Sequence, residues 1–118
     1  VYGHIERRFI EYGIDPWIGM FGLGSRAIVM VADLIYLRDD PEMTGRCQRL
    51  FRQLCKDMAA MGIGLYRSHI TFMGDAVDMP TWGNGALPAF NDRIKAALDP
   101  NNIIAPGKQG IGRIGRIG

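Results

Sequence analysis

The sequence has few of the features that define specialised classes of protein. No apolar stretch approaches the length needed to cross a bilayer, and the first residues mix charged and apolar side chains where a signal peptide would be apolar. We therefore expect no membrane association. The expected location is the cytoplasm, with the periplasm as the alternative if a targeting segment precedes Val1.

A strong excess of charge is also missing. The formal net charge of +2 is too small to indicate a nucleic-acid partner, so none is expected. The densest cationic group is interpreted as the solvent-exposed face of one helix, and it consists of Arg46, Arg49, Arg52 and Lys56.

Cysteine is scarce, with only Cys47 and Cys55 in the chain. On a helix these two residues would lie about two turns apart, which is too far for a disulfide. We interpret them as buried thiols in a reducing compartment, and we expect no metal site.

What is present is the composition of one soluble globular domain. The 118 residues are 47% hydrophobic and 22% charged, which suits a single domain with a modest core. Helical spacing of apolar residues predicts an opening helix over residues 2–12 that stops near Gly13. A weak strand over residues 14–23, a turn at Gly24 and Ser25, and a central strand over residues 27–36 are expected to follow.

The middle of the chain carries the most regular helix pattern. Asp40 and Pro41 are typical of a helix start, and an apolar stripe continues to a stop before Gly62. Imperfect alternation then predicts a strand over residues 65–73 with one polar face. A polar loop around Trp82 follows, and then a helix over residues 88–98 that turns Phe90, Ile94 and Ala97 inward.

This order of elements predicts an α+β fold with a ferredoxin-like antiparallel sheet and helices on one face. Compared with the ferredoxin-like order, the first strand is missing. An unpaired sheet edge would remain, so we expect it to be filled by another chain, which makes a homo-oligomer the predicted state.

Several motifs between residues 65 and 110 resemble the C-terminal part of the vanillyl-alcohol oxidase and p-cresol methylhydroxylase flavoenzymes. The matching residues are Tyr66-Arg67-Ser68-His69, Phe72-Met73, Trp82, Phe90-Asn91, Ile94-Lys95 and residues 99–110. The resemblance implies that residues 1–110 are a substrate-cap domain and part of a longer protein. Residues 111–118 would form an irregular tail with a repeated Ile-Gly-Arg sequence.

The resemblance assigns Tyr66 and Arg67 to catalysis and substrate binding. In the family this pair binds the oxygen of a para-alkylated phenol and stabilises its phenolate, and the arginine also lies near the flavin. Adjacent strand residues point to opposite faces, so the segment must bend for both to reach one ligand. On pattern alone, a sheet tyrosine beside a surface arginine is the favoured interpretation, and the family match reverses that preference.

The same resemblance places the closing segment along FAD. It implies cofactor contacts by Arg67, Asn101, Pro106, Gly107 and Lys108, with the ammonium of the lysine near the flavin's pyrimidine edge. Asn102 stands where relatives commonly have glycine, a mild departure because asparagine tolerates a left-handed backbone.

Other residues are given structural interpretations. His69 is interpreted as a structural histidine, and His4 is distinct from the histidine that binds flavin covalently in some relatives. Residues 110–115 satisfy the pattern G-x-G-x-x-G, but they neither follow a clear strand nor open a helix, so we reject them as a nucleotide site.

The function implied is the substrate-binding part of an FAD-dependent oxidoreductase that oxidises para-substituted phenols of the 4-cresol or vanillyl-alcohol type by hydride transfer. FAD would be bound mainly by a domain outside this chain, so the chain alone is expected to be inactive. A cytochrome subunit is a further partner in that family. The alternative is a non-catalytic ferredoxin-like interaction or dimerisation module.

Overall fold

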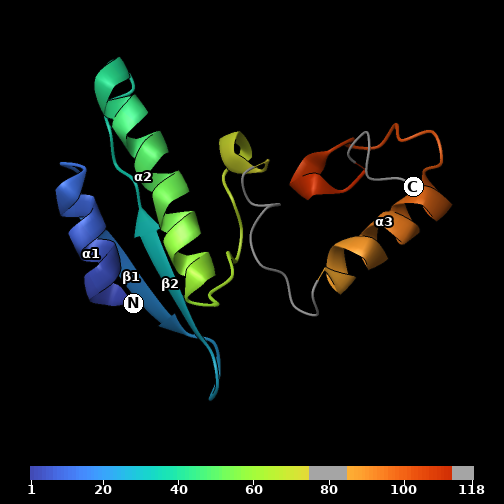
Figure 1. Ribbon diagram of the computed structural model, residues 1–118, viewed down its shortest axis with the longest axis horizontal. Helices are drawn as coiled ribbons and strands as arrows, with labels where there is room; N and C mark the ends of the chain where they lie inside the picture. The colour runs from blue at the N-terminus through green and yellow to red at the C-terminus, as the bar shows by residue number, and fades with distance from the viewer. Residues whose placement is uncertain (75–84, 113–118) are drawn as a thin grey trace. The chain divides into compact units, whose positions relative to one another are not determined.

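The computed structural model describes residues 1–74 and 85–112 (Figure 1). The chain divides into two compact units, an N-terminal unit of Val1–Met58 and a C-terminal unit of Ala59–Gly118. The predicted loop around Trp82 and the tail from residue 113 onward lie outside the described residues. Each unit is described by itself.

The opening helix of the N-terminal unit forms as predicted. Helix α1 covers Tyr2–Glu11 with Tyr12 as its C-cap, and the next residue is Gly13, whose φ of +64° lies in the left-handed region. The Gly13 amide donates to the Ile10 carbonyl, and the next amide, of Ile14, donates to the Phe9 carbonyl at 3.0 Å. A glycine adopts this conformation without steric cost, which explains why the helix stops there.

A single antiparallel hairpin follows α1. Strand β1 (Trp17–Gly22) pairs with β2 (Ile28–Asp33) in a register that sets Trp17 opposite Asp33 and Gly22 opposite Ile28. Both strands are shorter than predicted. The strand expected over residues 27–36 forms as β2, but in the described part of the chain it pairs with β1 alone and is not a central strand.

Helix α2 is the longest element and begins where the sequence indicated. It covers Pro41–Ala60, and the Asp40 carboxylate accepts the Met43 amide proton at 2.9 Å as an N-cap. Cys47 and Leu50 are the buried members of its apolar stripe, while Cys55 is half-buried.

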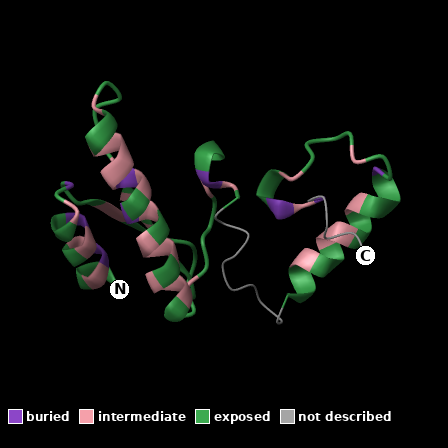
Figure 2. Cartoon of the chain, turned by 45° about the horizontal axis from the view of Figure 1, so that its top comes forward, coloured by how far each residue is buried: buried purple, intermediate pink, exposed green. Residues whose placement is uncertain are grey.

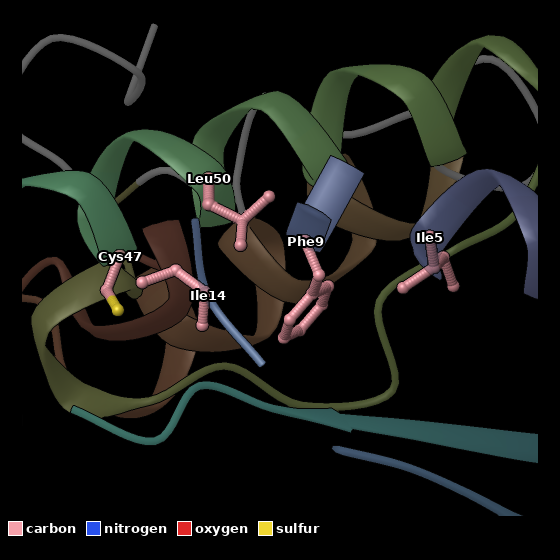
Figure 3. Close-up of a cluster of buried hydrophobic side chains, with 5 residues drawn as sticks. All are labelled: Ile5, Phe9, Ile14, Cys47 and Leu50. Carbon is pink, nitrogen blue, oxygen red and sulfur yellow. The ribbon is translucent and has the colours of Figure 1, made fainter. Parts of the chain in front are cut away.

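The core of the N-terminal unit lies between the two helices and one face of the hairpin (Figure 3). Residues i and i+2 of a strand share a face, so Ile18, Met30 and Ala32 are brought to the same side by the register. All three pack against the cluster of buried side chains, which consists of Ile5, Phe9, Ile14, Cys47 and Leu50. Both helices therefore cover the same face of the sheet, as the predicted fold class requires.

The strand predicted over residues 65–73 is wrong. This segment is irregular and contains one short 3-10 helix, η1, at Ile70–Phe72. His69 Nδ1 accepts the Thr71 amide proton at 3.2 Å, and such local side-chain bonding competes with a strand ladder. Phe72 is buried while Ile70 is exposed, so the alternation has no continuous apolar face to bury.

The last helix begins slightly earlier than predicted. Helix α3 covers Ala86–Leu98, with Pro88 in the first turn, where amide protons have no helical partner and proline is tolerated. The expectation that Phe90, Ile94 and Ala97 face inward is wrong: Phe90 is 59% exposed, and no residue of α3 is buried (Figure 2). The described chain is thus an α+β fold with a two-stranded antiparallel sheet. None of its described helices combines the length and apolarity that a membrane span needs.

Candidate functional site

Tyr66 and Arg67 lie on the irregular segment between α2 and η1. Both side chains are exposed, and Tyr66 is 76% accessible. The requirement for a bend in a strand disappears, because this backbone is not a strand and adjacent side chains need not leave opposite faces. The phenolic hydroxyl and the guanidinium are both available to a ligand.

The backbone that follows this pair is anchored locally. His69 caps η1: besides the bond to the Thr71 amide, its Nδ1 lies 3.1 Å from the Thr71 hydroxyl. Its ring is also tilted against that of Phe72, with centroids 6.3 Å apart. Because Phe72 is buried, it fixes the end of the segment that carries Tyr66 and Arg67. The structural interpretation of His69 agrees with these contacts.

A buried carboxylate organises the other end of the site. Asp99 is buried and accepts amide protons from Ile103 at 2.9 Å and Ile104 at 2.8 Å. The Lys95 ammonium pairs with the same carboxylate and also donates to the Ile104 carbonyl. The lysine, followed by these amides, lowers the pKa of Asp99 from 3.8 to about 2. Asp99 therefore ties the end of α3 to the start of the closing segment.

The closing segment is a compact turn with several left-handed residues. Asn102 has a φ of +51°, as expected for an asparagine that replaces glycine, and its Nδ2 donates to the Gly112 carbonyl at 2.8 Å. Ala105 and Gly107 also have positive φ. The Gly107 amide donates to the Ile111 carbonyl at 2.9 Å, which closes the turn around the short 3-10 helix η3 (Lys108–Gly110).

One hydrogen bond brings the two ends of the site together. Gln109 Nε2, next to Lys108, donates to the Ser68 hydroxyl, next to Arg67, at 3.3 Å. This bond joins residues 41 positions apart in the sequence. Arg67 and Lys108, the two charged residues of the predicted site, are the sequence neighbours of Ser68 and Gln109. Asn101 and Pro106 are exposed on the closing segment, and Gly107 is half-buried.

The charges of the site are uncompensated by other described residues. Neither Arg67 nor Lys108 forms an ion pair within residues 1–74 and 85–112. Asn102 Oδ1 is buried without a hydrogen-bond partner in the same residues. Two exposed cations and a phenolic hydroxyl are suitable donors for a ligand with anionic oxygens, and the FAD that the resemblance implies is such a ligand. The described residues contain no cluster of three or more metal-ligating side chains.

Three contributors were not assigned a role from the sequence. Ser68 and Gln109 join the two segments, and Asp99 holds the backbone between α3 and the turn. Asp99 was noted only as the first residue of the matching segment 99–110. Its position four residues after Lys95 on a helical pattern was the available signal, since such pairs face each other.

Comparison with known proteins is consistent with these features. Residues 27–109 match the family of FAD linked oxidases, C-terminal domain. The chain is 33% identical over 107 residues to the 4-cresol dehydrogenase [hydroxylating] flavoprotein subunit of Pseudomonas putida, covering 90% of this chain and 20% of that protein. It is 27% identical to the 1'-carboxy-chondrochloren decarboxylase of Chondromyces crocatus, covering 88% of this chain and 18% of the relative.

A solved structure shares the fold. The 4-ethylphenol oxidase from Gulosibacter chungangensis, in its isoeugenol complex, superposes with a TM-score of 0.84 and 31% identity over 93% of this chain and 21% of that one. The chain spans about a fifth of the length of each of these proteins. Because the family match extends over most of its residues, the chain belongs to the family described as "FAD linked oxidases, C-terminal domain".

Proposed function

We propose that this chain supplies the phenol-binding part of an FAD-dependent oxidoreductase that oxidises para-substituted phenols by hydride transfer. The names of two relatives refer to 4-cresol and 4-ethylphenol, which are both phenols with a para alkyl group. A third relative is named as a decarboxylase, so family membership does not by itself define the reaction. The proposal therefore depends on the chemistry of the site.

The observation that carries the proposal is the hydrogen bond between Ser68 and Gln109. It connects the segment of Tyr66 and Arg67 to the turn of Lys108, although these lie far apart in the sequence. A site that oxidises a phenol beside a flavin needs donors for the phenol oxygen on one side and for the cofactor on the other. The contact supports one site with both sets of donors.

Tyr66 and Arg67 would act on the phenol oxygen. Loss of hydride from the benzylic carbon leaves a quinone methide, and this loss is easier when the ring oxygen is already anionic. The tyrosine hydroxyl and the arginine guanidinium would donate hydrogen bonds to that oxygen and stabilise its negative charge. The phenolate and the transition state that follows it carry negative charge on this oxygen, which the neutral phenol lacks, so the two donors would stabilise both relative to the bound phenol.

Lys108 and the closing turn would face the cofactor. FAD, when bound, accepts the hydride and so supplies the oxidation. Arg67 and Lys108 would provide fixed positive charge beside the flavin, which favours a reduced ring that carries negative charge. Asn101, Pro106 and Gly107 belong to the same turn, and their proposed part is to contact the flavin; Asn101 and Pro106 are exposed and Gly107 is half-buried.

Arg67→Ala in the FAD-bound protein that contains this chain tests the proposal. Removing one preorganised donor typically costs about 3 kcal/mol, so flavin reduction by a para-alkylphenol should slow by about a hundredfold or more. The Kd of the phenol should change less than this rate. Arg67→Lys should recover only part of the loss, since an ammonium lacks the planar fork of the guanidinium. Rapid-reaction absorbance of the flavin measures both quantities.

Arg93→Ala is the matched control. Arg93 lies on the exposed surface of α3, so the same loss of charge should leave flavin reduction nearly unchanged. An unaltered reduction rate in Arg67→Ala would remove the residue from the site and leave the interpretation of Arg67 as a surface arginine.

A further inference from the structure

The N-terminal unit has a groove of about 440 Å³ where α1 ends beside α2. The groove is lined by residues at the end of α1 and by two arginines of α2. The residues concerned are Ile10, Glu11, Tyr12, Gly13, Arg46 and Arg49. None of these belongs to the Tyr66 and Lys108 site.

Arg46 is held in the groove without a hydrogen bond for its Nε. This atom is buried and has no partner in the described part of the chain. A Cβ placed on Gly13 would lie 2.8 Å from Arg46 Nη1, closer than such contacts allow. The absence of a side chain at Gly13 therefore makes room for the guanidinium, as well as permitting the left-handed turn.

Arg49, three residues further along α2, reaches the same groove. A Cβ on Gly45 would be 3.3 Å from Arg49 Nη1, so this guanidinium also packs over a glycine. No ion pair joins either arginine to a described carboxylate. Glu11, the carboxylate on the groove wall, is instead paired with Arg8 Nη1 at 2.8 Å.

We propose that this groove binds an oxyanion, either a carboxylate or a phosphate, through Arg46 and Arg49. Both arginines line the groove and neither is paired with a described carboxylate, so an oxyanion would supply hydrogen-bond acceptors together with the opposite charge. Each guanidinium group offers planar, paired donors that match the geometry of such anions. The pairing of Glu11 with Arg8 reduces its repulsion of the ligand.

The competing explanation is that Arg46 only stabilises the carbonyl end of α1. A cation near a helix C-terminus does so by interacting with unpaired carbonyls and with the helix dipole. Such a role requires no ligand, and its effect would be independent of which anion is present. Anion dependence therefore separates the two explanations.

The test is an NMR titration of the 118-residue chain with inorganic phosphate and, separately, sodium acetate, at ionic strength held constant with sodium chloride. The Nε–Hε signal of Arg46 should shift and saturate with a Kd of about a few millimolar, the range for one weak contact site. Saturation by acetate identifies a carboxylate ligand and saturation by phosphate a phosphate ligand, and either result supports the shared chemistry.

Variants make the test specific. Arg46→Gln and Arg49→Gln should each weaken binding by about tenfold, as expected for loss of a charged hydrogen bond. Arg49→Gln alters an exposed side chain, so it remains informative even if Arg46→Gln fails to fold. Lys56→Gln removes the same charge from an exposed position of α2 outside the groove and should leave the Kd within about twofold.

Two results would overturn the proposal. One is a shift that follows chloride as closely as phosphate and acetate. The other is an equal loss of affinity in Lys56→Gln and Arg49→Gln, which would reduce the effect to net charge.

Discussion

At the scale of single residues, Asp57 is the polar centre of the N-terminal unit. It accepts hydrogen bonds from Arg8 Nε at 2.7 Å and Gln53 Nε2 at 2.8 Å, and His4 Nε2 lies 2.7 Å from its Oδ2. The Arg8 guanidinium is the main reason that the pKa of Asp57 falls from 3.8 to about 2. Because Asp57 lies on α2, while Arg8 and His4 lie on α1, this carboxylate joins the two helices.

The lowered pKa of Asp57 predicts how stability depends on pH. A carboxylate with a lower pKa in the folded state contributes stability above pH of about 4, and this is lost as pH falls towards 2. Asp57→Asn should cost about 2 kcal/mol in free energy of unfolding at pH 7, the scale of charged hydrogen bonds. The difference from the unaltered chain should shrink between pH 4 and 2. Urea unfolding across this range is the measurement.

Asp15→Asn serves as the control for this pH dependence, since Asp15 is exposed. Its unfolding free energy should follow that of the unaltered chain at every pH. A difference between Asp57→Asn and the unaltered chain that stays constant from pH 7 to pH 2 would contradict the assignment.

Asp99 has a comparable role in the C-terminal unit, where it acts on backbone amides. We predict that Asp99→Asn frees the amides of Ile103 and Ile104 to exchange with solvent, because an amide oxygen is a weaker acceptor than a carboxylate and does not pair with Lys95. Hydrogen exchange by NMR should show faster exchange at these two positions. Asp39→Asn is the control, because Asp39 is exposed, whereas Asp92 accepts a hydrogen bond from the Gly112 amide. Unchanged exchange rates of the Ile103 and Ile104 amides would show that the turn is stable without the Asp99 carboxylate.

At the scale of elements, sequence reasoning succeeded where a local signal and a buried stripe agree. α2 has a capping aspartate, a proline at its first position and buried Cys47 and Leu50, so its start could be predicted from the chain alone. Residues 65–73 have alternation without a partner strand or a buried face, and alternation alone does not make a strand. The exposure of Phe90 and Ile94 on α3 could not be predicted either. Their apolar spacing predicts a helix, but it does not show whether described residues cover that side of the helix.

The N-cap of α2 gives an element-scale prediction. Asp40→Ala removes the acceptor of the Met43 amide and should lower the free energy of unfolding by about 1 kcal/mol. Asp39→Ala alters the preceding exposed aspartate and should change it by less than about 0.5 kcal/mol. Paired thermal unfolding curves provide the comparison, and equal losses in the two variants would reject the cap.

For the molecule as a whole, the candidate site was predicted from motifs and its connections from the structure. Tyr66, Arg67 and Lys108 match positions of a known family, so they could be selected as candidate site residues from the sequence alone. The contact from Gln109 to Ser68 depends on how the chain folds back after α3, which no local pattern encodes. The sequence therefore indicated the chemical groups, and the fold added the contact between their neighbours Ser68 and Gln109.

The face of the hairpin that the helices leave uncovered supports a prediction about assembly. Trp17, Phe21 and Val31 share this face by register, and Trp17 is 65% and Phe21 57% exposed. No described strand pairs with the outer edge of β1 or β2. Exposed apolar faces and open sheet edges are both typical sites of association. We therefore expect the 118-residue chain to self-associate through this hairpin.

Phe21→Glu tests this expectation because it places a charge on the uncovered face. Light scattering after gel filtration should give a mass above that of the 13.1 kDa monomer for the unaltered chain. Phe21→Glu should raise the Kd of association by about tenfold or more, as truncating a central aromatic anchor does. Leu37→Glu makes a similar change at an exposed residue outside both strands and should leave the mass unchanged. If the unaltered chain is a monomer at every concentration, the hairpin face does not drive association. If Phe21→Glu and Leu37→Glu have equal effects, the contact lies elsewhere.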